Sequence, residues 1–289
     1  MNRIVLKSFA KTNPLLFVGS KREDGFHSLF TFYQTLSLYD KIVLEIEKGE
    51  FEITLSSNAK IPLNADNLVY KAIESFCSLY GIRDRSFKVF IEKSIPQGGG
   101  LGGGSSNAGA VLKALAGYFG TGMSASLFNI ASLIGSDVPF FLYGGSCLGL
   151  GRGEIVFPVR DLEYTDFLAV FPGKHFATGK MYSLFDLSGE FDNLTENEFS
   201  KKVADIYQKG YRAFYNSFEK ILEKADSDVF SVFSKLKKNG FFPFLSGSGS
   251  VFLIFGDNLE KAESFIPASY KVLKANFLNG KEYERLLFN

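Results

Sequence analysis

The sequence predicts an α+β protein of two abutting domains that divide somewhere between residues 155 and 172. Its 289 residues suit one large domain or two ordinary ones, and 46% of them are hydrophobic, enough for a sizeable core. β-prone segments alternate with helical patterns up to about residue 171, whereas helical patterns dominate from 176 to 238. This change of pattern is the reason for placing a boundary between the two parts.

Short strands are expected in the first part of the chain, at 3–9, 14–18, 29–35, 42–46, 51–55 and 87–91. The polar segment that ends at Pro14 is expected to separate the first strand from the second. Gly49 lies between two β-prone segments, which is typical of a hairpin. The second half of this region adds strand-like segments at 146–150, 154–159 and 166–171.

Helices are expected between and after these strands. The first begins at Asp66-Asn67, repeats its apolar residues at helical spacing and ends before Gly81. A second follows the glycine-rich stretch, and a third extends roughly from Ser124 to Ile134. Beyond the helical region, a strand at 251–255, another helix and a last strand at 270–275 are expected to close the chain.

Composition excludes several classes of protein. The net charge of +1 provides no basic surface of the kind that nucleic-acid binders need. Two distant cysteines and two histidines disfavour a disulfide framework or a structural metal centre. Charge interrupts the N-terminus, and no apolar segment approaches the ~20 residues of a spanning helix. A soluble, cytoplasmic protein with no nucleic-acid or membrane partner is expected, and its oligomeric state is left open.

A glycine-rich loop lies between the strand at 87–91 and the next helix. Six of the seven residues from Gly98 to Gly104 are glycine, so backbone N–H groups can converge on an anion. The following helix adds unpaired amides and the positive end of its dipole. Ser105 or Ser106 is expected to cap that helix, and both hydroxyls can hold a phosphate oxygen or a Mg²⁺ ion. The loop therefore predicts a phosphate-binding site.

The glycine-rich loop also has other interpretations. It could be a plain surface connection, and the spacing of Gly98, Gly100 and Gly103 formally matches a dinucleotide-binding fingerprint. No clear βαβ unit surrounds it, however, and no acidic residue ends a following strand. A Walker P-loop is excluded because no Gly-Lys pair is followed by Ser or Thr, and the protein-kinase motifs are missing.

The segment from Pro96 to Ser106 resembles the central motif of the GHMP kinases, Pro-x-x-x-Gly-Leu-Gly-(Gly)-Ser-Ser. Further matches run in the same order from about residue 8 to 256 and include the segments 10–15, 21–29, 34–40, 135–141, 151–154, 216–219 and 246–250. The stretch Asp24-Gly25-Phe26-His27 is the most discriminating, because other GHMP kinases lack it. It resembles a motif of the branch that phosphorylates 4-diphosphocytidyl-2-C-methyl-D-erythritol. Thr12 and Phe26 depart from the pattern, which usually has an aliphatic residue and a tyrosine there.

The resemblance implies a two-domain GHMP kinase fold. Residues 1–160 would form an ATP-binding domain like ribosomal protein S5 domain 2, and residues 161–289 a ferredoxin-like α/β domain. The active site would lie in the cleft between them. There the enzyme would transfer the γ-phosphate of ATP, with Mg²⁺, to the 2-hydroxyl of a small-molecule substrate with a CDP group. This step belongs to the non-mevalonate pathway to isoprenoid precursors.

The resemblance also implies roles for particular residues. Asp137 is the candidate base, with Lys11 beside it to stabilise charge on the attacking oxygen or the γ-phosphate. The ATP site would comprise Asn67, Lys93, Pro96, Gln97, Gly98, Gly99, Gly100, Leu101, Gly102, Gly103, Gly104, Ser105 and Ser106. The substrate site would comprise Asn13, Phe26, His27, Thr178 and Tyr182, with His27 reading the cytosine edge and two aromatic rings enclosing the base. No residue is assigned as a metal ligand.

Taken one at a time, these residues leave structural alternatives open. Asp137 could cap a turn, Lys11 could lie at the surface, and His27 could be a satisfied structural histidine. Tyr182 could be a core aromatic, and Asn67 could simply start a helix. Two other functions also stay open, another GHMP kinase of the mevalonate pathway or of homoserine, and a nucleotide sensor without catalysis.

Overall fold

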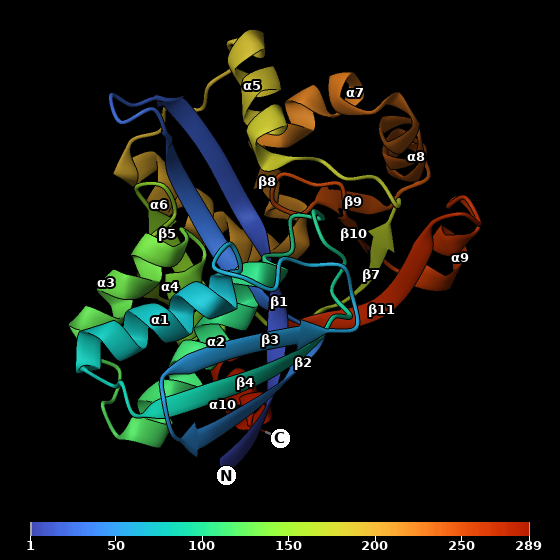
Figure 1. Cartoon of the computed structure of the whole chain (residues 1–289). Helices are drawn as coiled ribbons and strands as arrows, with labels where there is room; N and C mark the ends of the chain where they lie inside the picture. Colours follow the sequence, from blue (N-terminus) through green and yellow to red (C-terminus); the bar gives the residue numbers. More distant parts are fainter. Residues whose placement is uncertain (1, 289) are drawn as a thin grey trace.

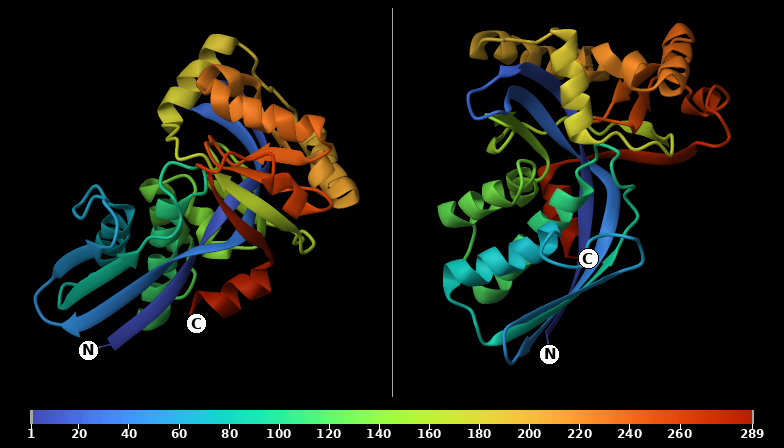
Figure 2. Two further views of the ribbon diagram at one scale, coloured as in Figure 1. Left: turned by 90° about the vertical axis from the view of Figure 1, so that its right-hand side faces the viewer. Right: turned by 45° about the horizontal axis from the view of Figure 1, so that its top comes forward.

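Two long N-terminal strands connect both halves of the molecule. The computed structural model describes residues 2–288, and in it β1 (Asn2–Lys21) and β2 (His27–Lys48) pair antiparallel from Asn2 opposite Ile46 to Lys21 opposite His27. Figure 2 shows this pair as curved ribbons that extend from one half into the other. The two strands expected at 3–9 and 14–18 are therefore one strand. The polar segment shifts the register between Phe9 and Leu15 without ending the strand, as bulges do.

The remaining strands extend this pair into a mixed sheet. Its order is β3 (Glu52–Ser57), β4 (Arg85–Glu92), β2, β11 (Lys271–Leu278), β7 (Asp166–Phe171), β10 (Phe252–Phe255) and β9 (Phe242–Leu245). β5 (Ser146–Leu150) pairs with β2 and β6 (Ile155–Pro158), and β8 (Tyr215–Asn216) pairs with β1. β11 joins the two halves, since it pairs with β2 on one side and with β7 on the other (Figure 1).

The expected hairpin around Gly49 is wrong. β3 pairs with β4 in parallel, and β4 pairs antiparallel with β2, so β4 lies between the two strands that the hairpin would have joined. Burial explains why β3 pairs with β4 and not with β2. β4 buries Phe87, Val89 and Ile91 in strict alternation, whereas β3 buries only Leu55, so β4 takes the central position and β3 the edge.

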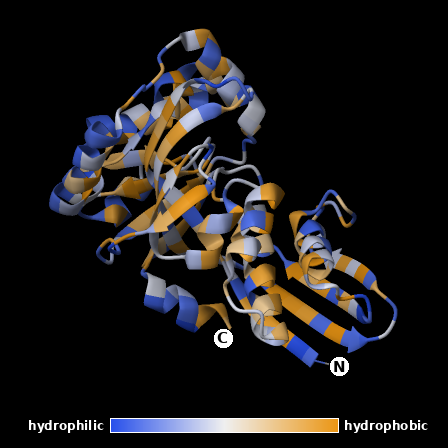
Figure 3. Ribbon diagram, turned by 90° about the vertical axis from the view of Figure 1, so that its left-hand side faces the viewer, coloured by the Kyte–Doolittle hydropathy of each residue, from blue (hydrophilic) through white to orange (hydrophobic). Residues whose placement is uncertain are grey.

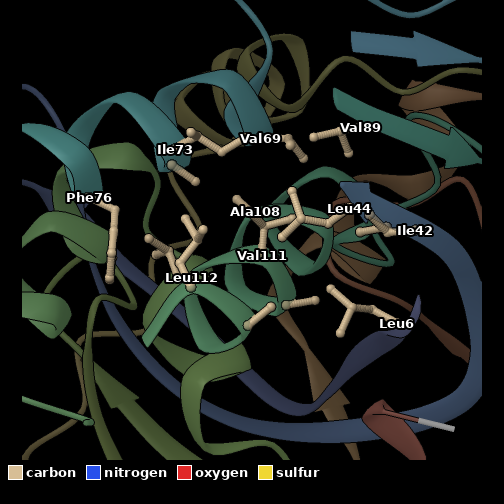
Figure 4. Close-up of a cluster of buried hydrophobic side chains, with 14 of the residues drawn as sticks. Leu6, Ile42, Leu44, Val69, Ile73, Phe76, Val89, Ala108, Val111 and Leu112 are labelled. Atoms are coloured by element: carbon tan, nitrogen blue, oxygen red, sulfur yellow. The ribbon is translucent and has the colours of Figure 1, made fainter. Parts of the chain in front are cut away.

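Four helices cover one face of the N-terminal part of the sheet: α1 (Leu68–Tyr80), α2 (Gly103–Phe119), α3 (Ala125–Ile134) and α4 (Val138–Tyr143). Their apolar faces meet those of the strands in a first core, in which Val69 and Ile73 of α1 and Val111 of α2 pack with Leu44 and Val89 (Figure 4). The prediction of α1 is confirmed, with Asn67 capping its start and Gly81 ending it at φ 67°. α2 begins earlier than expected, after Gly102, and no serine side chain caps it.

The second half has its own helices and its own core. α5 (Thr178–Ser188), α7 (Leu222–Ala225), α8 (Ser227–Lys238) and α9 (Leu259–Glu263) pack with β7, β10 and β9, whereas α6 (Glu196–Lys209) packs against β1 and β2. Phe185, Phe218, Phe233 and Phe252 are buried together there. Hydrophobic and hydrophilic residues alternate along the long strands (Figure 3), so the hydrophobic side chains of each strand lie on one face of the sheet. Within residues 2–288, no helix is long and apolar enough to cross a membrane.

A last helix, α10 (Gly280–Leu287), was not predicted and returns to the first half. Asn279 and Glu282 form a capping box at its start, and Tyr283 and Leu287 are buried in the first core. Lys113 of α2 pairs with Glu284 and donates to the carbonyl of Leu142 at 3.0 Å. α10 therefore packs beside β1 (Figure 1). The division into 1–160 and 161–289 stays a prediction, and so does the cytoplasmic location.

Candidate active site

A pocket of ≈ 800 Å³ lies where the glycine loop, the β1–β2 pair and α5 meet. It brings together nearly all the residues singled out from the sequence: Lys11, Asn13, Phe26, His27, Asn67, Lys93, every residue from Pro96 to Ser105, Asp137, Thr178 and Tyr182. Ser106 is the exception and does not line it. The pocket also contains residues that the sequence analysis missed, among them Tyr33, Arg152 and Asp186.

The glycine loop needs its glycines for two physical reasons. Gly98, Gly100 and Gly102 have φ of 68°, 77° and 69°, the left-handed region that favours glycine. A Cβ atom on Gly100 would overlap the carbonyl oxygen of Ser246, and one on Gly98 would overlap the ring of His175. The loop therefore lies tightly against the second half of the chain, with its backbone facing the pocket.

The two serines after the loop have different surroundings. Ser106 is buried, and its hydroxyl lies 2.6 Å from that of Ser8 and donates to the carbonyl of Phe9 at 2.5 Å. Ser105 lines the pocket instead. In the first turn of α2, only Ser105 is thus placed to offer its hydroxyl to a bound phosphate or to an ion that accompanies it.

Lys11 and Asp137 form an ion pair in the pocket. Lys11 comes from the irregular middle of β1, is buried, and places Nζ 3.3 Å from Oδ2 of Asp137. The same ammonium donates to Oδ1 of Asn13 at 2.7 Å, and Asn13 in turn donates to Thr31 at 2.8 Å. These contacts hold the ammonium in one place.

Asp137 immediately precedes α4, yet its carboxylate makes no capping hydrogen bond. The structural alternative, a carboxylate used to cap a turn, is therefore not what the structure shows. One oxygen faces Lys11, and the other accepts a hydrogen bond from the hydroxyl of Tyr33 at 3.0 Å. The side chain is 30% exposed, so a molecule in the pocket can reach it.

Tyr33 was not predicted as a site residue, because it is one of many aromatic residues in a β-prone segment and no local motif marks it. It is buried and stacks on Phe140 with ring centroids 4.9 Å apart. Burial raises the pKa of the Tyr33 phenol well above its ordinary value, and the negative charge of Asp137 raises it further. The phenol is thus a neutral hydrogen-bond donor to Asp137 at physiological pH.

His27 is buried, and both nitrogens of its ring have protein atoms beside them. Nδ1 lies 2.8 Å from the carbonyl oxygen of Gly19, and Nε2 lies 3.0 Å from Oδ1 of Asp186. Tyr182 stacks on the imidazole with ring centroids 5.0 Å apart. The ring of Phe26 is 51% exposed and lies under the guanidinium of Arg152, 4.7 Å from centroid to Cζ. Thr178 contacts Ser248 at 3.2 Å between hydroxyls.

Lys93 and Asn67 are both engaged within the protein. Lys93 pairs with Asp40, which is fully buried and also accepts from the backbone of Ser94 at 2.7 Å. Asn67 caps α1 by accepting from Val69 at 2.9 Å and donates to the carbonyl of Pro62. Both line the pocket, but their polar groups already have partners. Their assignment to the adenine site stays a prediction.

Comparison with known proteins agrees with this fold. The model of the GHMP kinases N terminal domain matches residues 67–145. Solved structures of L. major mevalonate kinase and of homoserine kinase from Cytophaga hutchinsonii align with TM-scores of 0.69 and 0.65 at 14% and 17% identity, a likeness of fold alone. The L. major comparison covers 96% of each chain, and the homoserine kinase comparison covers 97% of this chain and 96% of the other. The chain thus has the fold of the GHMP kinases, and its predicted α+β two-domain fold is confirmed.

Closer relatives define the branch. A crystal structure of 4-(cytidine 5'-diphospho)-2C-methyl-D-erythritol kinase aligns with a TM-score of 0.79 at 28% identity and covers 96% of this chain and 100% of the other. The 4-diphosphocytidyl-2-C-methyl-D-erythritol kinase of Thermotoga maritima is 38% identical over 86% of this chain and 90% of its own. That of Thermosipho melanesiensis is 32% identical over 98% and 97%. The chain belongs to the 4-diphosphocytidyl-2-C-methyl-D-erythritol kinase family.

Proposed function

We propose that this chain transfers the γ-phosphate of ATP to the 2-hydroxyl of 4-diphosphocytidyl-2-C-methyl-D-erythritol, a step in the non-mevalonate pathway to isoprenoid precursors. The observation that carries the proposal is the Lys11–Asp137 pair, which lies in one pocket with the glycine loop and with the Phe26–His27 segment. A phosphate site, a base and aromatic rings for a pyrimidine are the parts that this reaction requires.

Asp137 acts as the base in this proposal. As the substrate oxygen attacks the γ-phosphorus, its proton passes to the Asp137 carboxylate, the bond from the γ-phosphorus to the β–γ bridging oxygen breaks, and ADP leaves with that oxygen. Lys11 lies 3.3 Å from Asp137 and stabilises negative charge on the attacking oxygen or the γ-phosphate. Asn13 and Tyr33 keep the ammonium and the carboxylate in position.

Mg²⁺ is proposed as the partner of ATP. Within the described residues 2–288, no group of three or more His, Cys, Asp or Glu side chains is arranged to hold a metal ion. The donor set therefore fits an ion that is held mainly by the phosphates of the nucleotide, with the Ser105 hydroxyl as the loop residue placed to contact it. When bound, the ion neutralises charge on the β- and γ-phosphates.

A panel of alcohol substrates tests the proposal. ADP release would be measured with the cytidine-diphosphate substrate, with mevalonate and with homoserine, each with ATP and Mg²⁺. Turnover of the cytidine-diphosphate substrate alone is expected. Turnover of mevalonate or homoserine instead would assign the pocket to another GHMP kinase activity, and ATP binding without any turnover would make the protein a sensor.

A further inference from the structure

The imidazole of His27 has no ring nitrogen left for a ligand. Nδ1 lies 2.8 Å from the carbonyl oxygen of Gly19, and Nε2 lies 3.0 Å from Oδ1 of Asp186, so each ring nitrogen already has a protein oxygen within hydrogen-bond distance. One face of the imidazole also stacks on the ring of Tyr182. A base in this part of the pocket would have to break one of these bonds to be read by the His27 ring.

Asp186 offers what His27 lacks. It lines the same pocket, its side chain is 35% exposed, and within the described residues 2–288 its carboxylate has His27 as its hydrogen-bond partner. Tyr182 precedes it by four residues on α5, so the aromatic ring and the carboxylate project from the same face of the helix. One oxygen is held by His27, and the carboxylate keeps acceptor capacity for a molecule that packs beside Tyr182.

We infer that Asp186 is the residue that selects cytosine over uracil, with His27 as the positioning residue that holds its carboxylate. The inference rests on the proposed function and names the group that reads the base. The two pyrimidines have the same ring shape, so stacking on Tyr182 cannot separate them. They differ at position 4, where cytosine carries an amino donor and uracil a carbonyl acceptor. A carboxylate accepts from the first and repels the second.

The test compares the cytidine substrate with its uridine counterpart. The wild-type enzyme is expected to prefer cytidine in kcat/KM by about 100-fold, the size of one good base-edge contact. In Asp186→Asn, the amide oxygen can accept from His27 while the amide nitrogen turns toward the base and donates to the uracil carbonyl. The preference is therefore expected to fall at least about 10-fold, mainly through KM. Glu223→Gln removes a carboxylate from neighbouring helix α7 outside the pocket and should keep the wild-type preference.

The outcomes separate the inference from the proposed function. If the wild type prefers cytidine and Asp186→Asn keeps the full preference, Asp186 does not read the base, although the proposed function stands. If the wild type phosphorylates neither nucleotide substrate but accepts another alcohol, the proposed function fails and the inference fails with it. Equal wild-type turnover of the cytidine and uridine substrates overturns the inference alone.

A binding measurement keeps the inference testable if the asparagine variant folds poorly. CDP, UDP and the diphosphate of the pyrimidin-2-one riboside, which has only hydrogen at position 4, would be titrated into the wild type and Asp186→Ala by calorimetry. The wild type should bind CDP about 10-fold more tightly than the pyrimidinone, and UDP more weakly than either. In Asp186→Ala the advantage of CDP over the pyrimidinone should vanish. If that advantage persists at its wild-type size, another group recognises the amino group.

Discussion

The hydroxyl of Tyr33 donates a hydrogen bond to Oδ1 of Asp137 at 3.0 Å, although 104 residues separate them in the chain. The other carboxylate oxygen of Asp137 lies 3.3 Å from Lys11. A neutral phenol and an ammonium therefore fix both oxygens of the proposed base. The two contacts differ in kind, so variants of each residue should have separable effects.

Asp137→Asn is expected to lower kcat by about 10³-fold, because the amide cannot accept the substrate proton. ATP binding should stay close to the wild-type value, since the glycine loop is untouched. Steady-state ADP release and calorimetric titration with ATP and Mg²⁺ would measure the two effects. Near-normal turnover in this variant would remove Asp137 from the role of base.

Tyr33→Phe is expected to lower kcat about 10-fold, with little change in KM for either substrate. The phenylalanine keeps the stacking on Phe140 but removes the hydrogen bond that orients Asp137. Steady-state kinetics, with each substrate varied up to saturation, would show the change in kcat separately from any change in KM. A change in KM alone would mean that Tyr33 acts in binding and does not position the base.

The pH dependence of stability should reflect the buried tyrosines. Burial raises the pKa values of Tyr33 and Tyr283 well above the ordinary value of a tyrosine. Their contribution to the free energy of unfolding is fully present below the unfolded pKa of about 10 and is lost as pH rises through the folded pKa, because unfolded phenols release protons first. Urea unfolding between pH 8 and pH 11 should show this loss, and Tyr33→Phe should reduce its slope.

Ser105→Ala should change the metal dependence of activity, whereas Ser106→Ala should change the stability of the fold. Ser105 lines the pocket, so its loss is expected to raise the Mg²⁺ concentration that half-maximal activity requires. Ser106 is bonded to Ser8 and Phe9 in the interior, so its loss should lower the free energy of unfolding by about 1–3 kcal/mol. Metal titrations of activity and denaturant unfolding would separate the two. Equal metal dependence in both variants would contradict the assignment of Ser105.

Gly100→Ala is expected to abolish activity and destabilise the protein. Its φ of 77° disfavours a side chain, and a Cβ atom would overlap the carbonyl of Ser246. Gly117→Ala is the matched control, because Gly117 lies within α2 with open space around its Cβ position. The control should raise the free energy of unfolding by about 0.5–1 kcal/mol and leave activity unchanged. An active Gly100→Ala enzyme would show that the loop can move away from the second half.

The features that the sequence predicted well have local causes. Asn67 and Gly81 mark the ends of α1 through capping chemistry, and the glycine loop is dense enough to identify by inspection. Lys11 and Asp137 came from the family resemblance, and the structure places them in contact. Asn279 and Glu282 form a local capping signal before α10 that the sequence analysis passed over.

The features that were missed depend on distant contacts. Pairing of β3 with β4 instead of β2 is decided by burial across the whole sheet, which no segment contains by itself. Tyr33 and Asp186 look ordinary along the chain and gain their significance only beside Asp137 and His27. Sequence spacing carries no information about such pairs, because the strands and helices that present them meet only in the folded molecule.

The return of α10 to the first core has a consequence for biosynthesis. Tyr283 and Leu287 complete a core that otherwise consists of residues from β1 to β4, from the helices α1 to α4 and from the end of β11. A growing polypeptide therefore cannot complete this core until α10 has left the ribosome, even though N-terminal domains generally fold first. The half that holds the glycine loop can therefore complete its folding only after the second half of the chain has been synthesised. A nascent chain stalled before Asn279 should expose apolar surface that a chaperone can bind.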